Sequence, residues 1–179
     1  MRAALVSAAD ALDTAGANRS LATVAIGVAA TKAIVGAKAM ARARSGAMWT
    51  KQTGLSADAF ASDSAAADYA TASHAGHGVA IRFNRATADA ASYADAADDA
   101  GAYSEMVAGN EAVIAWDDER ASLSFAARQA GYTLITTWNA ESGACEYCWG
   151  LNGTEWDDVP SETPPAHPRC LCSLSTRVA

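Results

Sequence analysis

The chain has 179 residues, enough for one domain or for one domain with an arm, and a formal net charge of −7. It is 51% hydrophobic but only 7% aromatic, and much of its apolar content is alanine, which buries little area. This composition places the main core where larger apolar residues recur, mostly after about residue 103.

Charge is distributed unevenly along the chain. Residues 1–54 carry seven Lys/Arg and two Asp, whereas residues 55–130 carry four Arg and twelve acidic residues. An acidic body argues against a general nucleic-acid-binding protein, while the basic segment, about residues 19–51, could contact DNA or an acidic protein. We expect no secretory signal, because Met1–Asp13 is mildly amphipathic and lacks a long apolar stretch. We expect no membrane partner, because the apolar run at 21–37 is short, rich in Ala and Gly, and interrupted by Lys32.

Composition divides the chain into three predicted parts. They are a basic, Ala-rich helical arm at 1–54, an acidic Ala/Asp/Ser-rich segment at 55–103 that is helical or partly ordered, and a helix plus β module at 104–179. The expected fold class is therefore α+β: a mainly helical N-terminal part followed by a small, β-rich, zinc-stapled C-terminal module.

The N-terminal part predicts two helices. One covers about 3–12, and the second runs from Asn18 or Ser20 to about Arg44, followed by a loop at 45–57. An apolar stripe at 3-4-7 spacing marks the second helix, and Lys38 and Arg42 continue its register. The stripe consists of Leu21, Val24, Val28 and Val35, and Ile26 and Ile34 widen the apolar surface. Such a helix is either buried within a bundle or is an arm that docks on a partner.

The middle segment predicts thin surface helices, at about 58–71 and 86–100, formed by alanine propensity. His74 and His77 form an H-x-x-H pair beside glycines. A metal site needs three or four convergent ligands, so we interpret them as two solvated loop histidines.

The strongest helical pattern covers 104–130, with Ser104 as a cap and Gly131 as the stop. Its apolar face contains Met106, Val113, Trp116, Leu123, Ala127 and Ala130. The acidic run Asp117–Glu119 is interpreted as a solvated face rather than a catalytic site.

β-type patterns follow. Residues Tyr132–Trp138 are β-branched and aromatic and predict a strand, and Asn152-Gly153 predicts the turn of a hairpin between 148–151 and 154–156. Residues Cys170–Leu174 predict a final short strand, in which period 2 places Cys170 and Cys172 on one side.

All four cysteines lie within the last part of the chain, together with a histidine. The candidate metal ligands are Cys145, Cys148, His167, Cys170 and Cys172. Thiolate and imidazole are the ligands that Zn²⁺ prefers, and four protein ligands make a structural site with no open position. Cys145, Cys148 and His167 are the first choices, with either Cys170 or Cys172 as the fourth ligand of one zinc ion.

Other uses of these cysteines fit less well. A nucleobase deaminase needs an H-x-E motif, which this chain lacks, and no βαβ pattern surrounds Cys145 as a thioredoxin-like site requires. Two disulfides are chemically possible, but without a secretion signal a metal site is favoured.

The tail resembles the C-terminal region of the phage Mu protein F-like head morphogenesis family, over about Ser104 to Leu174. The matching features are a helix, a strand with a tryptophan, C-x-x-C, a Leu-x-Gly turn and P-P-x-H-P-x-C-x-C; the residues are Trp138, Cys145, Cys148, Leu151, Gly153, Pro164, Pro165, His167, Pro168, Cys170 and Cys172. The family's usual arginine before the last cysteine is Leu171 here, and Arg169 stands two positions earlier.

The resemblance implies a non-enzymatic minor capsid protein of a tailed phage that acts in head assembly near the portal. Its implied partners are the portal or the major capsid protein, in an assembly of multiple copies. Its implied location is the virion, and the host cytoplasm during assembly. The alternative is a small metal-dependent effector, nuclease or redox enzyme that uses the Cys/His cluster.

Overall fold

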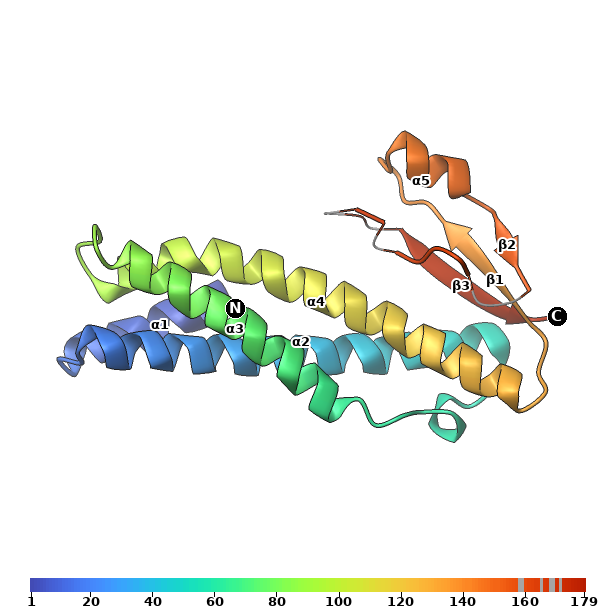
Figure 1. The fold of residues 1–179 in the computed structure, drawn as a ribbon, viewed down its shortest axis with the longest axis horizontal. Coiled ribbons are helices and arrows are strands. Elements are labelled where there is room, and N and C mark those ends of the chain that lie inside the picture. The colour runs from blue at the N-terminus through green and yellow to red at the C-terminus, as the bar shows by residue number, and fades with distance from the viewer. Residues whose placement is uncertain (158–159, 165, 168–169, 171) are drawn as a thin grey trace. The chain divides into compact units, whose positions relative to one another are not determined.

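The structure is a computed structural model that describes residues 1–157, 160–164, 166–167, 170 and 172–179. Its elements in chain order are α1 (Arg2–Thr14), α2 (Arg19–Thr53), a 3₁₀ turn (Ala57–Ala59), α3 (Ala65–Ala86), α4 (Tyr93–Gln129), β1 (Leu134–Asn139), α5 (Glu146–Leu151), β2 (Glu155–Trp156) and β3 (Ser173–Val178) (Figure 1). The expected α+β class is confirmed: a helical N-terminal part precedes a small sheet.

Two compact units, each discontinuous in sequence, make up the fold. Unit 1 contains Met1–Lys38 and Ser64–Glu111, and unit 2 contains Ala39–Asp63 and Ala112–Ala179. Helices α2 and α4 therefore each contribute one half to either unit. The boundaries predicted from composition, at 54 and 103, are different ones, and the second lies inside α4.

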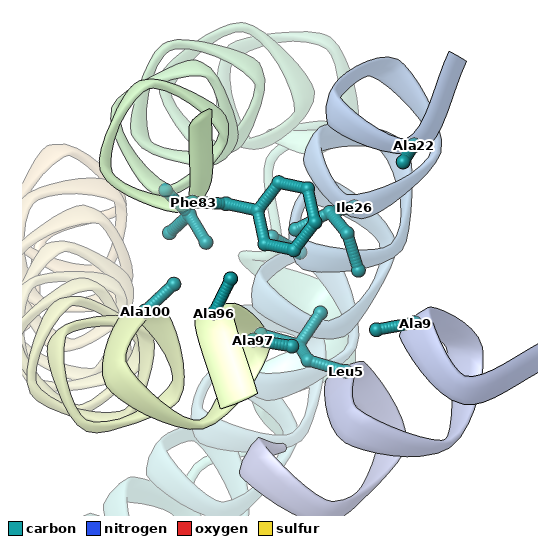
Figure 2. Packing of buried hydrophobic residues seen from close by; sticks show 10 residues of the cluster. Leu5, Ala9, Ala22, Ile26, Phe83, Ala96, Ala97 and Ala100 are labelled. Carbon is teal, nitrogen blue, oxygen red and sulfur yellow. The ribbon is translucent and has the colours of Figure 1, made fainter. Parts of the chain in front are cut away.

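Unit 1 is a helical bundle with an alanine-rich core. Leu5 and Ala9 of α1 pack with Ala22 and Ile26 of α2, Phe83 of α3 and the first turns of α4 (Figure 2). The α4 contribution is three alanines, Ala96, Ala97 and Ala100. Six of the ten buried residues of this cluster are alanine, and small side chains in this number allow helix backbones to approach closely.

A buried ion-pair network joins three helices of unit 1. Lys38 Nζ of α2 lies 2.9 Å from Glu111 Oε2 of α4, 3.4 Å from Asp68 Oδ1 of α3, and donates to Thr71 Oγ1 at 2.8 Å. Lys38 is only 2% exposed. A lysine is buried to this extent only when it is paired, so the network fixes how the three helices align.

Unit 2 contains a three-stranded antiparallel sheet of order β2-β1-β3. Six residue pairs join β1 to β3, from Leu134↔Val178 to Asn139↔Ser173. Alternate residues of β1 are buried, namely Leu134, Thr136 and Trp138. Leu134 packs with Trp49 of α2 and with Leu123 and Ala127 of α4, which anchors the strand on the helical half of the unit.

Several expected boundaries are wrong. Helix α2 continues through the predicted loop to Thr53, because Ser45 and Trp49 are fully buried in unit 2. Ser104 does not cap a helix: it lies buried inside α4, where its hydroxyl donates to Gly101 O at 2.7 Å. The histidines His74 and His77 are exposed, but they lie on α3 and not in a loop.

The predicted apolar stripe of α2 is not its buried face. Leu21, Val24 and Val28 are 55%, 63% and 50% exposed, whereas the buried row is Ala22, Ile26, Ala30 and Ile34. By length and composition alone, α2 also passes as a candidate membrane span, with 22% of its most apolar window buried. One such helix is weak evidence for a membrane span, and the row Ala22–Ile34 packs inside unit 1.

The predicted acidic face at 117–119 is also wrong. Asp117 is 8% exposed and Glu119 is 9% exposed, and only Asp118 is solvated. Arg42 of α2 pairs with Glu119 at 3.4 Å, so part of this run serves as an ion-pair partner inside unit 2. Met106 and Ala130, expected on the buried face of the same helix, are exposed, whereas Leu123 and Ala127 are buried as predicted.

Candidate metal centre

The C-x-x-C segment is a short helix, and not one arm of a hairpin. Cys145 is the N-cap of α5, with extended backbone angles, and Cys148 lies in the helix at 0% exposure. The carbonyl of Cys145 accepts a hydrogen bond from Trp149 N–H at 2.9 Å. This turn brings both thiols to one end of α5, as the i, i+3 spacing requires.

Asn152 and Gly153 attach α5 to the sheet. Gly153 has φ +79°, a conformation that favours glycine, and its N–H donates to Trp138 O at 2.8 Å. The Asn152 side chain accepts from Ala140 N–H at 2.9 Å. The predicted turn therefore exists, but it connects α5 to β2, and β2 pairs with β1.

The second cysteine pair lies just before β3. The predicted final strand is present, but it begins at Ser173 and not at Cys170, so Cys170 and Cys172 precede it. Cys170 and Cys172 are nevertheless both buried, at 4% and 6% exposure, and they pack with Trp138, Cys148 and Leu174. Pro165, Pro168, Arg169 and Leu171 of the motif lie outside the described residues.

The structure brings all five predicted ligands together in two overlapping groups. One is Cys145, Cys148 and His167, and the other is Cys148, Cys170 and Cys172; within each group the ligand atoms lie within 4.8 Å of one another. His167 Nε2 lies 3.3 Å from the Sγ atoms of both Cys145 and Cys148, and Cys148 Sγ lies 3.9 Å from Cys170 Sγ. Cys148 is thus common to both groups.

The shortest of these distances match those between two ligands of a tetrahedral ion, although Cys145 and His167 belong to one group and Cys170 and Cys172 to the other. With Zn–S near 2.3 Å and Zn–N near 2.0 Å, ligand atoms at tetrahedral corners lie about 3.8 Å apart for two sulfurs and about 3.5 Å apart for sulfur and nitrogen. The observed 3.9 Å and 3.3 Å are close to both values. The cluster could therefore hold a metal ion, and its thiol and imidazole donors are those of a soft or borderline metal.

The thiols differ in their local environments. A backbone hydrogen bond from Cys148 lowers the pKa of Cys145, whereas burial raises the pKa of Cys148 above its ordinary range. Burial raises the pKa of Cys170. Hydrogen bonds, chiefly those from the backbone of Cys172 and Ala166, lower this pKa by more than burial raises it, so the pKa lies below its ordinary value. Amide donors aimed at sulfur stabilise the thiolates that bind metal.

Two neighbours of the cluster were not indicated by the sequence motif. The Tyr147 hydroxyl donates to Glu162, which ties α5 to the loop that carries His167. A pocket of about 170 Å³ beside the cluster is lined by Glu141, Ser142, Gly143 and Ala144 together with Cys145, His167, Cys170 and Cys172. The C-E-Y-C spacing gave no signal for Glu162 or Glu141, because their proximity depends on the fold of the intervening loops.

Comparisons with known proteins found no matching family model, no matching curated protein and no matching solved structure. The functional argument therefore rests on the residues and geometry of this chain.

Proposed function

We propose that the protein is a structural, non-enzymatic minor head protein of a tailed phage, and that its C-terminal cluster holds one structural zinc ion. The observation that carries this proposal is that Cys145, Cys148 and His167 form one group of closely spaced ligand atoms, which shares Cys148 with a second group formed by Cys148, Cys170 and Cys172. The tail motif that contains these residues, including its proline-framed histidine, resembles the head morphogenesis family.

The zinc ion would act as a staple between α5 and the segment that leads into β3. Cys145, Cys148 and His167 supply three ligands, and either Cys170 or Cys172 supplies the fourth. The short Cys148–Cys170 distance of 3.9 Å favours Cys170 in the first shell of the metal and leaves Cys172 beside it. Four protein ligands leave no position for a water nucleophile, so the ion would contribute folding energy and not catalysis.

The proposed partners are the portal or the major capsid protein, in an assembly with multiple copies. Fewer cations are available for contact with DNA through residues 19–51 than the sequence suggests, because Lys38 and Arg42 form ion pairs within the protein. Arg19, Lys32, Arg44 and Lys51 remain exposed on α2. A protein surface is therefore the preferred partner for this segment.

The test is to purify phage particles from cells in which the gene is expressed from its own genome. Mass spectrometry of tailless heads should detect the protein in few copies per particle. A Cys148→Ser variant should be missing from heads, while Cys172→Ser should be incorporated. If the intact protein is absent from heads and tails alike, the proposed location in the virion is wrong.

A second candidate function is favoured by the pocket beside the cluster. Its 170 Å³ could admit a small molecule next to Cys145 and His167, with Glu141 as a nearby carboxylate. A metal-dependent effector, nuclease or redox enzyme would use this opening. Thiol labelling of the zinc-loaded protein separates the two: the structural site leaves one reactive cysteine at most, whereas two or more rapidly labelled cysteines favour the enzyme.

A further inference from the structure

An apolar groove of about 590 Å³ lies on the surface of unit 1 between α2 and α3. Four large side chains form its apolar lining: Val24 and Val28 from α2, and Tyr69 and Ile81 from α3. They are 63%, 50%, 61% and 41% exposed. In a unit whose core consists largely of alanine, this is an unusual place for the larger residues.

Close packing of the two helices creates the groove. A Cβ added to Gly27 would lie 3.1 Å from Ala80 Cβ, and one added to Gly76 would lie 2.1 Å from Thr31 Oγ1. Because the two backbones are this close, the larger side chains project outward and form the two sides of the groove, one on α2 and one on α3. Each wall follows an i, i+4 row, 24-28-32 on α2 and 69-73-77-81-85 on α3, which is the ridge pattern that accepts a third helix.

The charge of the groove is opposite to that of its surroundings. Unit 1 contains six Lys/Arg and nine Asp/Glu. Among the described residues, however, the groove has Lys32 and Arg85 at the ends of its two rows and no acidic residue. Both cations are exposed, and neither has an ion pair within the described part of the chain.

We infer that this groove binds an amphipathic α-helix of a partner protein, with acidic residues flanking its apolar stripe. The row from Tyr69 to Arg85 is about 24 Å long, which accommodates four to five helical turns. An apolar stripe would contact Val24, Val28 and Ile81, and carboxylates would reach Lys32 and Arg85. This inference goes beyond head assembly and does not depend on it, since any partner with such a helix satisfies the groove.

Other occupants fit the groove less well. A second copy seated groove to groove would bring Lys32 and Arg85 against their own counterparts, which costs affinity. An anionic membrane would satisfy the cations, but a flat surface leaves a concave groove between two helices unfilled. The experiment distinguishes a second copy and an anionic membrane from a partner helix.

The test is a display library of helical peptides with a fixed leucine stripe and flanks randomised among Glu, Gln, Ala and Lys, selected against the full-length protein. The selected peptides should carry Glu at flanks two to three turns apart. Their affinity should fall about tenfold or more when these Glu are changed to Lys. The double variant Lys32→Glu, Arg85→Glu should prefer the Lys-flanked peptides instead.

Matched variants locate the binding site. Val28→Glu should abolish peptide binding, whereas Met106→Glu, at a similarly exposed position of unit 1 (49% against 50%), should leave binding unchanged. Circular dichroism of both variants confirms that they fold. Selection of no binders, selection of Lys or Gln flanks, self-association lost in Val28→Glu, or preferential binding to phosphatidylserine vesicles would each overturn the inference.

Discussion

Unit 1 and the sheet half of unit 2 bury their chains with different kinds of side chain. Unit 1 packs alanines between helices and aligns them with the Lys38 network, so its contacts extend along whole helices. The β module has two long strands, one short helix and a small apolar cluster around Trp138, into which the cysteines themselves pack. The stability of unit 1 therefore comes from contacts spread along its helices, whereas the stability of the β module depends on a few residues around Trp138 and the cysteines.

Removal of the proposed zinc ion should therefore have the largest effect on stability, and this effect should be confined to the β module. Structural zinc sites in small modules contribute on the order of 10 kcal/mol of binding free energy, which is folding energy. We expect a strong chelator, or Cys148→Ser, to abolish hydrogen-exchange protection in β1 and β3 while protection in α3 persists. Equal loss in both regions, or no loss in either, would remove the distinction between the two kinds of packing.

Unit 1 should instead be most sensitive to the size of a single small residue. Gly76→Ala places a Cβ against Thr31 and within 2.9 Å of the Gly27 carbonyl oxygen, which is backbone and cannot easily move. We expect a net loss of about 1–3 kcal/mol in the free energy of unfolding, despite alanine's better helix propensity. Denaturant unfolding followed by helical circular dichroism measures it.

Gly36→Ala is the matched control for this substitution. Gly36 is an exposed helical residue, and an added Cβ meets nothing within 4 Å. The variant should gain about 0.5–1 kcal/mol, because only propensity acts. If both glycine variants change stability in the same direction, close helix packing does not determine the stability of unit 1.

A pH-dependent effect is expected from Asp117 in the helical half of unit 2. Burial raises the pKa of this carboxyl from 3.8 to about 7, and neither oxygen has a hydrogen-bond partner among the described residues. Between pH 4 and 7 the folded state binds the additional proton, so Asp117 makes stability fall as pH rises through this window.

Asp117→Asn should remove that slope. Above about pH 7 the variant should be more stable than the parent by up to about 4 kcal/mol, and below about pH 4 the two should converge. Thermal unfolding across this pH range gives the comparison. A parent protein whose stability rises from pH 4 to 7 more steeply than that of the variant would contradict the raised pKa.

The sequence predicted elements well where large residues alternate at a strict period. The first helix, the stop at Gly131 and the buried positions Leu134, Thr136 and Trp138 of β1 are confirmed. Tyr132, predicted as the start of the same strand and face, precedes β1 and is exposed. In α2 the same reasoning put the valines at the centre of the buried face, whereas the buried row alternates alanine with Ile26 and Ile34, which were expected only to widen that face. Where helices approach through small residues, the size of an apolar side chain is a poor guide to its burial.

The clustering of the five Cys and His side chains was predictable because metal-binding chemistry restricts residue type and spacing. Its supporting geometry was not, because α5 replaced a predicted hairpin arm and β3 starts after both cysteines. The burial of Asp117 was equally hidden, since an acidic run on a helix normally faces solvent and only the tertiary contacts of α4 place it inside. Position along the chain carries no information about such long-range partners.

Native mass spectrometry with metal analysis of the purified protein tests the central claim most directly. We predict one zinc ion per chain, retained in Cys172→Ser and lost in Cys148→Ser. A metal-free chain with two disulfides, or zinc that remains bound in Cys148→Ser, would contradict the account of the cluster as the staple of the β module.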